Sequence, residues 1–169
     1  MSKVIKCKLD SASIEQAIKE LQDYRKSLED KVRQLVESLA SDGVEVAKAW
    51  IMASQGDSEK PSAGYTVDSA GDITKAYITM QGKDVLFIEF GAGIHYNGND
   101  TPHAAEFGYG VGTYNPSSDN AFNPDGWYYW TGTERVHSYG TEGTYPMYHA
   151  AENARNTAIK KAIEIFSRS

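Results

Sequence analysis

The chain has 169 residues, of which 40% are hydrophobic and 24% are charged, so it is long enough to form one globular domain with its own core and too short for two. It has no stretch of about 20 apolar residues, and its first residues lack the apolar segment of a secretory signal peptide, so we expect neither a transmembrane helix nor that route of export. The single cysteine, Cys7, excludes an internal disulfide framework.

The formal net charge is −6, and nearly all of it falls in one segment. Residues 91–143 contain six acidic side chains and one basic side chain, Arg135, which gives this segment a charge of −5. The acidic residues are Asp100, Glu106, Asp119, Asp125, Glu134 and Glu142. Because such a segment repels phosphate groups and the rest of the chain is nearly neutral, the composition argues against a general nucleic-acid-binding surface.

Residues 10–54 are predicted to form a long helical arm, in which Ser13 and Gln16 have the spacing of an N-terminal capping box. Apolar residues recur at steps of three and four positions. They are Ile14, Ala17, Ile18, Leu21, Tyr24, Leu28, Val32, Leu35, Val36 and Leu39. This spacing is close to a heptad repeat, so we expect one part of the helix to pack on a partner chain and another on the chain's own sheet.

Residues 64–90 are predicted to form a β-hairpin region. Residues 72–80 alternate in polarity, as a half-buried strand does. The most apolar run, VLFIEF at residues 85–90, is predicted to be the next strand, joined by a tight turn at 81–84. In such a strand Glu89 points away from the face that holds Ile88 and Phe90, where we expect it to form an intersubunit or cap-like hydrogen bond.

Residues 91–143 form a long excursion that contains ten of the fifteen glycines and many aromatic residues. Disordered segments are poor in aromatic residues, so we expect this one to be ordered, with WYYW at 127–130 returning as a strand. A loop of this length is typically functional or ordered by a neighbouring molecule.

Residues 145–167 are then predicted to form a C-terminal helix, with Pro146 in its first turn. The prediction is a single α+β domain over residues 1–169, with both helices packed on a small antiparallel sheet.

Motifs for catalysis or ligand binding are weak. The stretch GAGIHYNG has Tyr96 where a dinucleotide fingerprint needs its third glycine, and the chain has no P-loop. His95, His103 and Glu106 could act in a metal-assisted hydrolase, although no motif such as HExxH supports such a site. Exposed Trp127 and Trp130 could instead belong to a carbohydrate- or peptide-binding module. Both readings stay open as alternatives.

Two motifs resemble those of a known family. The sequence EFGAG supplies Glu89, Phe90, Gly91 and Gly93, and YPMYHAA places Pro146, Met147 and Ala150 at the start of the last helix. In this pattern and order of elements the chain resembles the neck, or tail-completion, proteins of long-tailed phages and of prophage-derived tail-like particles. Members of that family are small α+β subunits between the head connector and the tail.

The resemblance implies a structural virion protein at the head–tail junction or tail end, made in the cytoplasm of the host bacterium, with no catalysis and no cofactor. It implies a ring of identical copies, expected to be six, docked on a tail-terminator or head-connector ring, with no membrane partner. DNA would only pass through the channel, past Asp100, Glu106, Asp119 and Asp125. The expected assembly residues are Glu89, Phe90, Gly91, Gly93, Tyr109, Trp127, Trp130, Pro146 and Met147.

Overall fold

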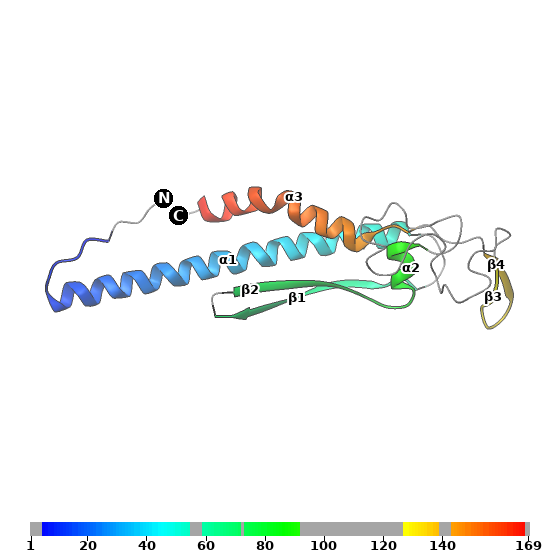
Figure 1. The fold of residues 1–169 in the computed structure, drawn as a ribbon, viewed down its shortest axis with the longest axis horizontal. Coiled ribbons are helices and arrows are strands. Elements are labelled where there is room, and N and C mark those ends of the chain that lie inside the picture. The colour runs from blue at the N-terminus through cyan, green and yellow to red at the C-terminus, as the bar shows by residue number, and fades with distance from the viewer. Residues whose placement is uncertain (1–4, 55–58, 72, 92–126, 139–142, 168–169) are drawn as a thin grey trace.

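A computed structural model describes residues 5–54, 59–71, 73–91, 127–138 and 143–167 (Figure 1). The helices in these ranges are α1 (Ser11–Ala53), α2 (Val85–Phe90) and α3 (Pro146–Ser167), and the strands are β1 (Ser62–Ala70), β2 (Ile73–Gln81), β3 (Trp127–Trp130) and β4 (Arg135–Ser138). The predicted α+β class is therefore confirmed. No helix within the described ranges is long and apolar enough to cross a membrane.

Helix α1 begins and ends within one residue of the predicted bounds, but its N-terminal cap differs from the prediction. The side chain of Asp10 accepts the backbone N–H of Ser13 at 2.8 Å. Asp10 therefore does what the predicted Ser13–Gln16 capping box was expected to do, because an aspartate just before the first turn satisfies one of the free N–H groups there. At 43 residues, the helix is about 65 Å long.

Strands β1 and β2 form an antiparallel hairpin, in which the pairing runs from Ser62 with Gln81 to Ala70 with Ile73. The alternation predicted from the sequence is present in β2, where every second residue from Thr74 to Met80 is half-buried and those between are exposed. The half-buried side chains face α1, with Ile78 paired across the strands with Tyr65. The opposite face, with Tyr77 and Ile73, is exposed.

The prediction that VLFIEF is a strand is wrong, because residues 85–90 form the helix α2. The hairpin partner of β2 is β1. Asp84 has φ 58° and turns the chain out of the strand direction, after which Ile88 N donates to Asp84 O at 3.0 Å. A short apolar run is compatible with either structure, and tertiary packing decides between them. In this helix Ile88, Glu89 and Phe90 are all buried, and the strand geometry that predicted opposite faces for Glu89 and its two neighbours does not apply.

The elements form layers around the C-terminal part of α1. Helix α3 runs antiparallel along one side of α1, and the β1–β2 hairpin covers another side (Figure 1). The core lies between these layers and at α2. Its buried apolar residues are Ala40, Val44, Ala47, Ile51, Ile88, Phe90, Ala150 and Ile165. All the buried residues of α1 lie in its last fourteen positions, from Ala40 onwards.

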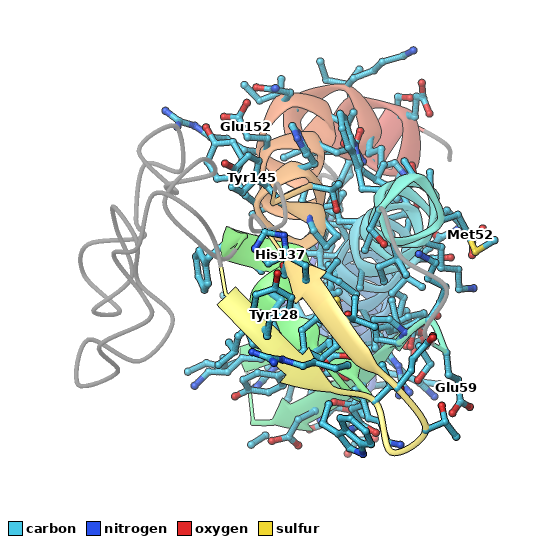
Figure 2. All side chains as sticks on the ribbon, turned by 90° about the vertical axis from the view of Figure 1, so that its right-hand side faces the viewer. Met52, Glu59, Tyr128, His137, Tyr145 and Glu152 are labelled. Atoms are coloured by element: carbon cyan, nitrogen blue, oxygen red, sulfur yellow. The ribbon has the colours of Figure 1, made fainter. Side chains whose placement is uncertain are left out.

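The N-terminal part of α1 extends past both the hairpin turn and the end of α3 (Figure 1). At the other end of the molecule, β3 and β4 form a second antiparallel hairpin, separate from the first. WYYW is thus a strand, as predicted. Tyr128 and His137 lie side by side across this hairpin, with ring centroids 4.4 Å apart (Figure 2).

Candidate functional site

The carboxylate of Glu89 joins α2 to the start of α3. Its Oε2 accepts the backbone N–H of Met147 at 2.8 Å, and its Oε1 accepts that of Tyr148 at 3.0 Å. The first N–H groups of a helix have no partner within the helix, and the residue before it usually supplies one through a short polar side chain. Here that residue is Tyr145, with φ 51°. Glu89 supplies the acceptors in its place, so the cap-like hydrogen bond expected from the sequence is present within the chain.

Burial makes the Glu89 carboxyl unusual. The residue is 7% exposed, and removal from water raises the pKa of its carboxyl above the ordinary value, while the hydrogen bonds from Met147 and Tyr148 act in the opposite direction. A carboxylate held at a helix N-terminus also interacts favourably with the helix dipole. The group is positioned to hold two elements together, with both oxygens engaged by backbone donors.

Gly143 and Thr144, just before α3, pack tightly against the backbone of residues 88–91. Thr144 N donates to Ile88 O at 2.8 Å. A Cβ added at Gly143 would lie 2.8 Å from Glu89 O, Gly91 N and Phe90 C. Gly91 ends α2 with φ 75°, a conformation that favours glycine. The segment just before the second motif therefore lies against the backbone of the first, and the two motifs are joined by the hydrogen bonds from Met147 N and Tyr148 N to the Glu89 side chain.

The described structure places only some of the predicted site residues. Phe90 and Pro146 are buried at the α2–α3 junction beside Glu89, and Met147 is half-buried there. Trp130 is 67% exposed on β3, which belongs to the separate β3–β4 hairpin, and Trp127 pairs with Ser138 at the start of the same strand. The others lie outside the described residues, so their predictions stay untested: Gly93, Tyr109, Asp100, Glu106, Asp119 and Asp125.

The extended part of α1 carries apolar side chains that the chain itself does not cover. Ile14, Ile18 and Leu21 are 43%, 50% and 56% exposed, and they follow one another at steps of four and three positions along one face. We call these three residues the α1 stripe. The sequence predicted that part of this helix packs on a partner chain, which remains a prediction.

A second exposed stripe lies on α3 and was missed in the sequence. Ile159, Ile163 and Phe166 are 76%, 64% and 39% exposed, again at steps of four and three. We call them the α3 stripe. Helix α3 also carries alanines at positions 150, 151, 154, 158 and 162, and both Ala150 and Ile165 are buried. The steps of four and three positions between its residues could have predicted this stripe, but the more numerous alanines of the same helix form a competing pattern.

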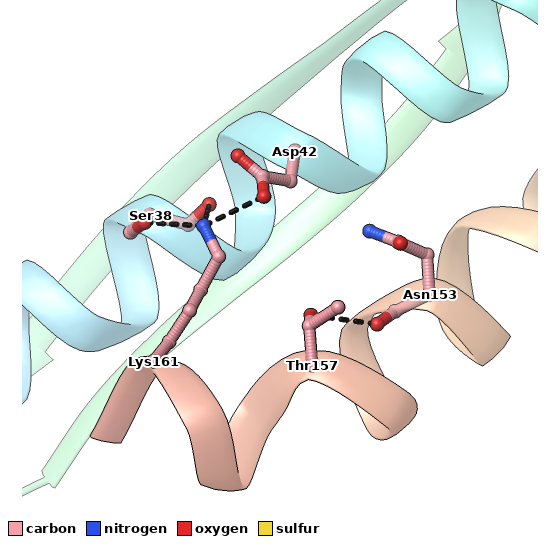
Figure 3. Close-up of polar contacts among 5 residues, drawn as sticks. All are labelled: Ser38, Asp42, Asn153, Thr157 and Lys161. Carbon is pink, nitrogen blue, oxygen red and sulfur yellow. Dashed lines mark hydrogen bonds and ion pairs between the residues drawn. The ribbon is translucent and has the colours of Figure 1, made fainter. Parts of the chain in front are cut away.

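A polar cluster between α1 and α3 was also not foreseen (Figure 3). Lys161 Nζ donates to Ser38 O at 3.1 Å and to Ser38 Oγ at 2.5 Å, and it forms an ion pair with Asp42 Oδ2 at 2.7 Å. The Lys161 side chain is only 17% exposed. This cluster fixes the position of α3 along α1.

The β3–β4 hairpin presents aromatic side chains to solvent. Tyr128, Tyr129 and Trp130 are about half to two-thirds exposed. The guanidinium of Arg135 lies 4.1 Å from the centre of the Tyr128 ring, a cation–π contact that holds this ring in place. Within the described ranges no three His, Cys, Asp or Glu side chains are grouped so that they could hold a metal ion. His95, His103 and Glu106 of the hydrolase alternative lie outside those ranges.

No protein-family model, curated protein or solved structure gives a significant match to the chain. The described structure contains a junction held by Glu89 and three exposed apolar or aromatic surfaces, on α1, α3 and β3. Surfaces of this kind are typical of contacts with other protein chains.

Proposed function

We propose that the chain is a structural subunit of a phage, or of a phage-tail-like particle, that forms a ring of six copies at the head–tail junction or tail end and completes or joins the tail. The observation that carries this proposal is the α1 stripe. It lies on a long helix that extends beyond the body of its own chain, where the three side chains stay exposed to water. Exposed apolar surface that follows a helical spacing is stabilised when a second protein covers it.

The geometry of the two family-like motifs supports the same proposal. Glu89 in the first motif accepts hydrogen bonds from Met147 and Tyr148 in the second. The resemblance thus involves two sequence segments that form one structural unit, rather than two unrelated matches. In the proposed particle this junction would hold α3 in a fixed direction relative to α2, so that every copy presents the same surfaces to its neighbours.

In this proposal the ring docks on a tail-terminator or head-connector ring and the protein catalyses no reaction. The acidic residues Asp100, Glu106, Asp119 and Asp125 are proposed to line the channel, where their charge would let DNA pass without binding. A ring viewed at high enough resolution would test this part by itself, because acids found on the outer wall would rule it out.

The state of association of the purified full-length chain tests the proposal. We expect light scattering to give a closed oligomer, and electron microscopy of negatively stained protein to show rings. In a variant that carries Ile14→Glu and Leu21→Glu, we expect the rings to dissociate into folded monomers with unchanged helical circular dichroism. A matched control adds the same charge on the opposite, exposed face of α1 through Gln16→Glu and Ser27→Glu, and should keep the rings. A wild-type chain that stays monomeric at every concentration would contradict the proposal.

A further inference from the structure

We propose that the α1 stripe of one copy packs antiparallel against the α3 stripe of the neighbouring copy. The inference rests on the proposed ring, and it names the two surfaces that join successive copies. Each stripe has three large apolar side chains at steps of four and three positions, and each is exposed in the single chain. Two such helices can interlock their side chains as in a coiled coil.

The spacings of the two stripes match in an antiparallel alignment. With Ile18 opposite Ile159, Ile14 falls opposite Ile163, because each lies four positions further along in opposite directions. The contact then contains two isoleucine pairs, Ile18 with Ile159 and Ile14 with Ile163. Leu21 extends the apolar contact on one side, and Phe166 extends it on the other.

The same alignment brings opposite charges together. Arg25 lies seven positions after Ile18, and Glu152 lies seven positions before Ile159. Arg25 and Glu152 therefore face each other two helical turns from the Ile18–Ile159 pair. Arg25 is exposed and Glu152 is half-buried in the single chain. A single oppositely charged pair beside an apolar contact sets its register and direction.

Pairing of two α1 stripes is less favourable. In a parallel pair in register, the heptad position of Arg25 faces Arg25 of the other copy, and like charges at that position repel. Pairing between identical surfaces would also join copies only two at a time, whereas a contact between two different surfaces can continue around a closed ring.

The contact cannot form within one chain. Lys161 of α3 contacts Ser38 of α1, and Ile18 lies twenty positions before Ser38. That separation is about 30 Å along the helix. The α3 stripe beside Lys161 is therefore out of reach of the α1 stripe of its own chain, and only another copy can bring the two together.

Disulfide cross-linking of full-length rings tests the contact directly. In a Cys7→Ser background, a variant with both Ile18→Cys and Ile159→Cys should give a ladder of covalent multimers on a non-reducing denaturing gel after mild oxidation. Each single variant should stay monomeric on that gel. The control variant with Lys26→Cys and Glu164→Cys, two exposed positions away from the stripes, should give no ladder. Dimers from Ile18→Cys alone, or no ladder from the double variant, would overturn the inference.

Charge exchange gives a second, independent test. Arg25→Glu alone and Glu152→Arg alone should each weaken association of the copies by about tenfold. The double variant restores an oppositely charged pair and should recover association to within about twofold. Failure of the double variant to recover would overturn the proposed register.

If wild-type rings form but neither test gives the expected result, the inference fails and the proposed function stands. If the wild-type chain forms no oligomer, the proposed function itself fails.

Discussion

Glu89 reaches across 58 positions of the sequence to accept the backbone N–H of Met147 at 2.8 Å. Its other oxygen accepts the N–H of Tyr148. A helix start that lacks a local capping side chain is thereby completed by a residue from another helix. Because both bonds are to backbone groups, they fix the direction of α3 whatever side chains follow it.

Removal of this carboxylate should destabilise the fold. Glu89→Ala leaves two N–H groups of α3 without their acceptors in a buried place, and we expect the free energy of unfolding to fall by about 2 kcal/mol. Glu89→Gln keeps one acceptor oxygen, so its effect should be about half as large. Urea denaturation followed by circular dichroism measures both. Glu164→Ala, on the exposed face of α3, serves as the control and should change stability by less than about 0.5 kcal/mol.

The effect of Glu89 should depend on pH in the direction opposite to that of a salt-bridged carboxylate. Its pKa is raised in the folded state by burial, so the folded chain binds its proton more tightly than the unfolded chain. Stability from this group is therefore fully present below the ordinary pKa of 4.5 and decreases as pH rises through the folded-state pKa. The stability of wild type minus that of Glu89→Gln should fall from pH 4 towards neutral pH. A difference that grew with pH would show that the two backbone hydrogen bonds outweigh burial.

Local patterns predicted the elements that depend on local contacts. The bounds of α1, the alternation along β2 and the start of α3 at Pro146 follow from helical spacing, strand periodicity and the fixed φ of proline. The six residues of VLFIEF carry no such periodicity. These residues form a helix after the left-handed turn at Asp84, and β2 pairs with β1 instead of with them.

The candidate site could be predicted only in part for the same reason. Both motifs were recognised in the sequence, and a cap-like hydrogen bond was expected at Glu89. Its partners lie 58 and 59 positions away, and no spacing rule connects a buried glutamate to a helix start at that distance. The link between Lys161 and Ser38 spans 123 positions. Contacts of this kind arise from the layering of the whole chain.

Gly143 should tolerate no side chain. The backbone of residues 89–91 lies where its Cβ would be, and backbone atoms cannot move aside as a flexible side chain can. We expect Gly143→Ala to lower the free energy of unfolding by about 2 kcal/mol, as overpacking typically does. Gly64→Ala is the matched control, because a Cβ there meets nothing within 4 Å. A neutral effect at Gly143 would mean that the segment before α3 is not packed as closely on the backbone of residues 89–91 as described.

The Lys161 ammonium should stabilise the packing of α3 on α1. Lys161→Met keeps most of the apolar stem and removes the bonds to Ser38 and the ion pair with Asp42. We expect a loss of about 1 kcal/mol in thermal or urea unfolding, since the group is half-buried and bonded to partly exposed partners. Lys160→Met changes the neighbouring, exposed lysine and should have little effect. An equal loss of stability in both variants would mean that the interaction of positive charge with the dipole of α3 causes the effect, and not the bonds to Ser38 and Asp42.

The extended part of α1 should be the least protected helix segment of a single copy. Residues 11–30 have no buried side chain, whereas Ala40, Val44, Ala47 and Ile51 are buried. The ion pair between Arg25 and Glu29 is exposed and contributes only a few tenths of a kcal/mol. Hydrogen exchange measured on the monomeric Ile14→Glu, Leu21→Glu variant should therefore show fast exchange at residues 11–30 and slow exchange at 40–51. In wild-type rings the first segment should become protected, because a neighbouring copy covers it. Slow exchange of residues 11–30 in the monomer would mean that this part of α1 is stable without a partner.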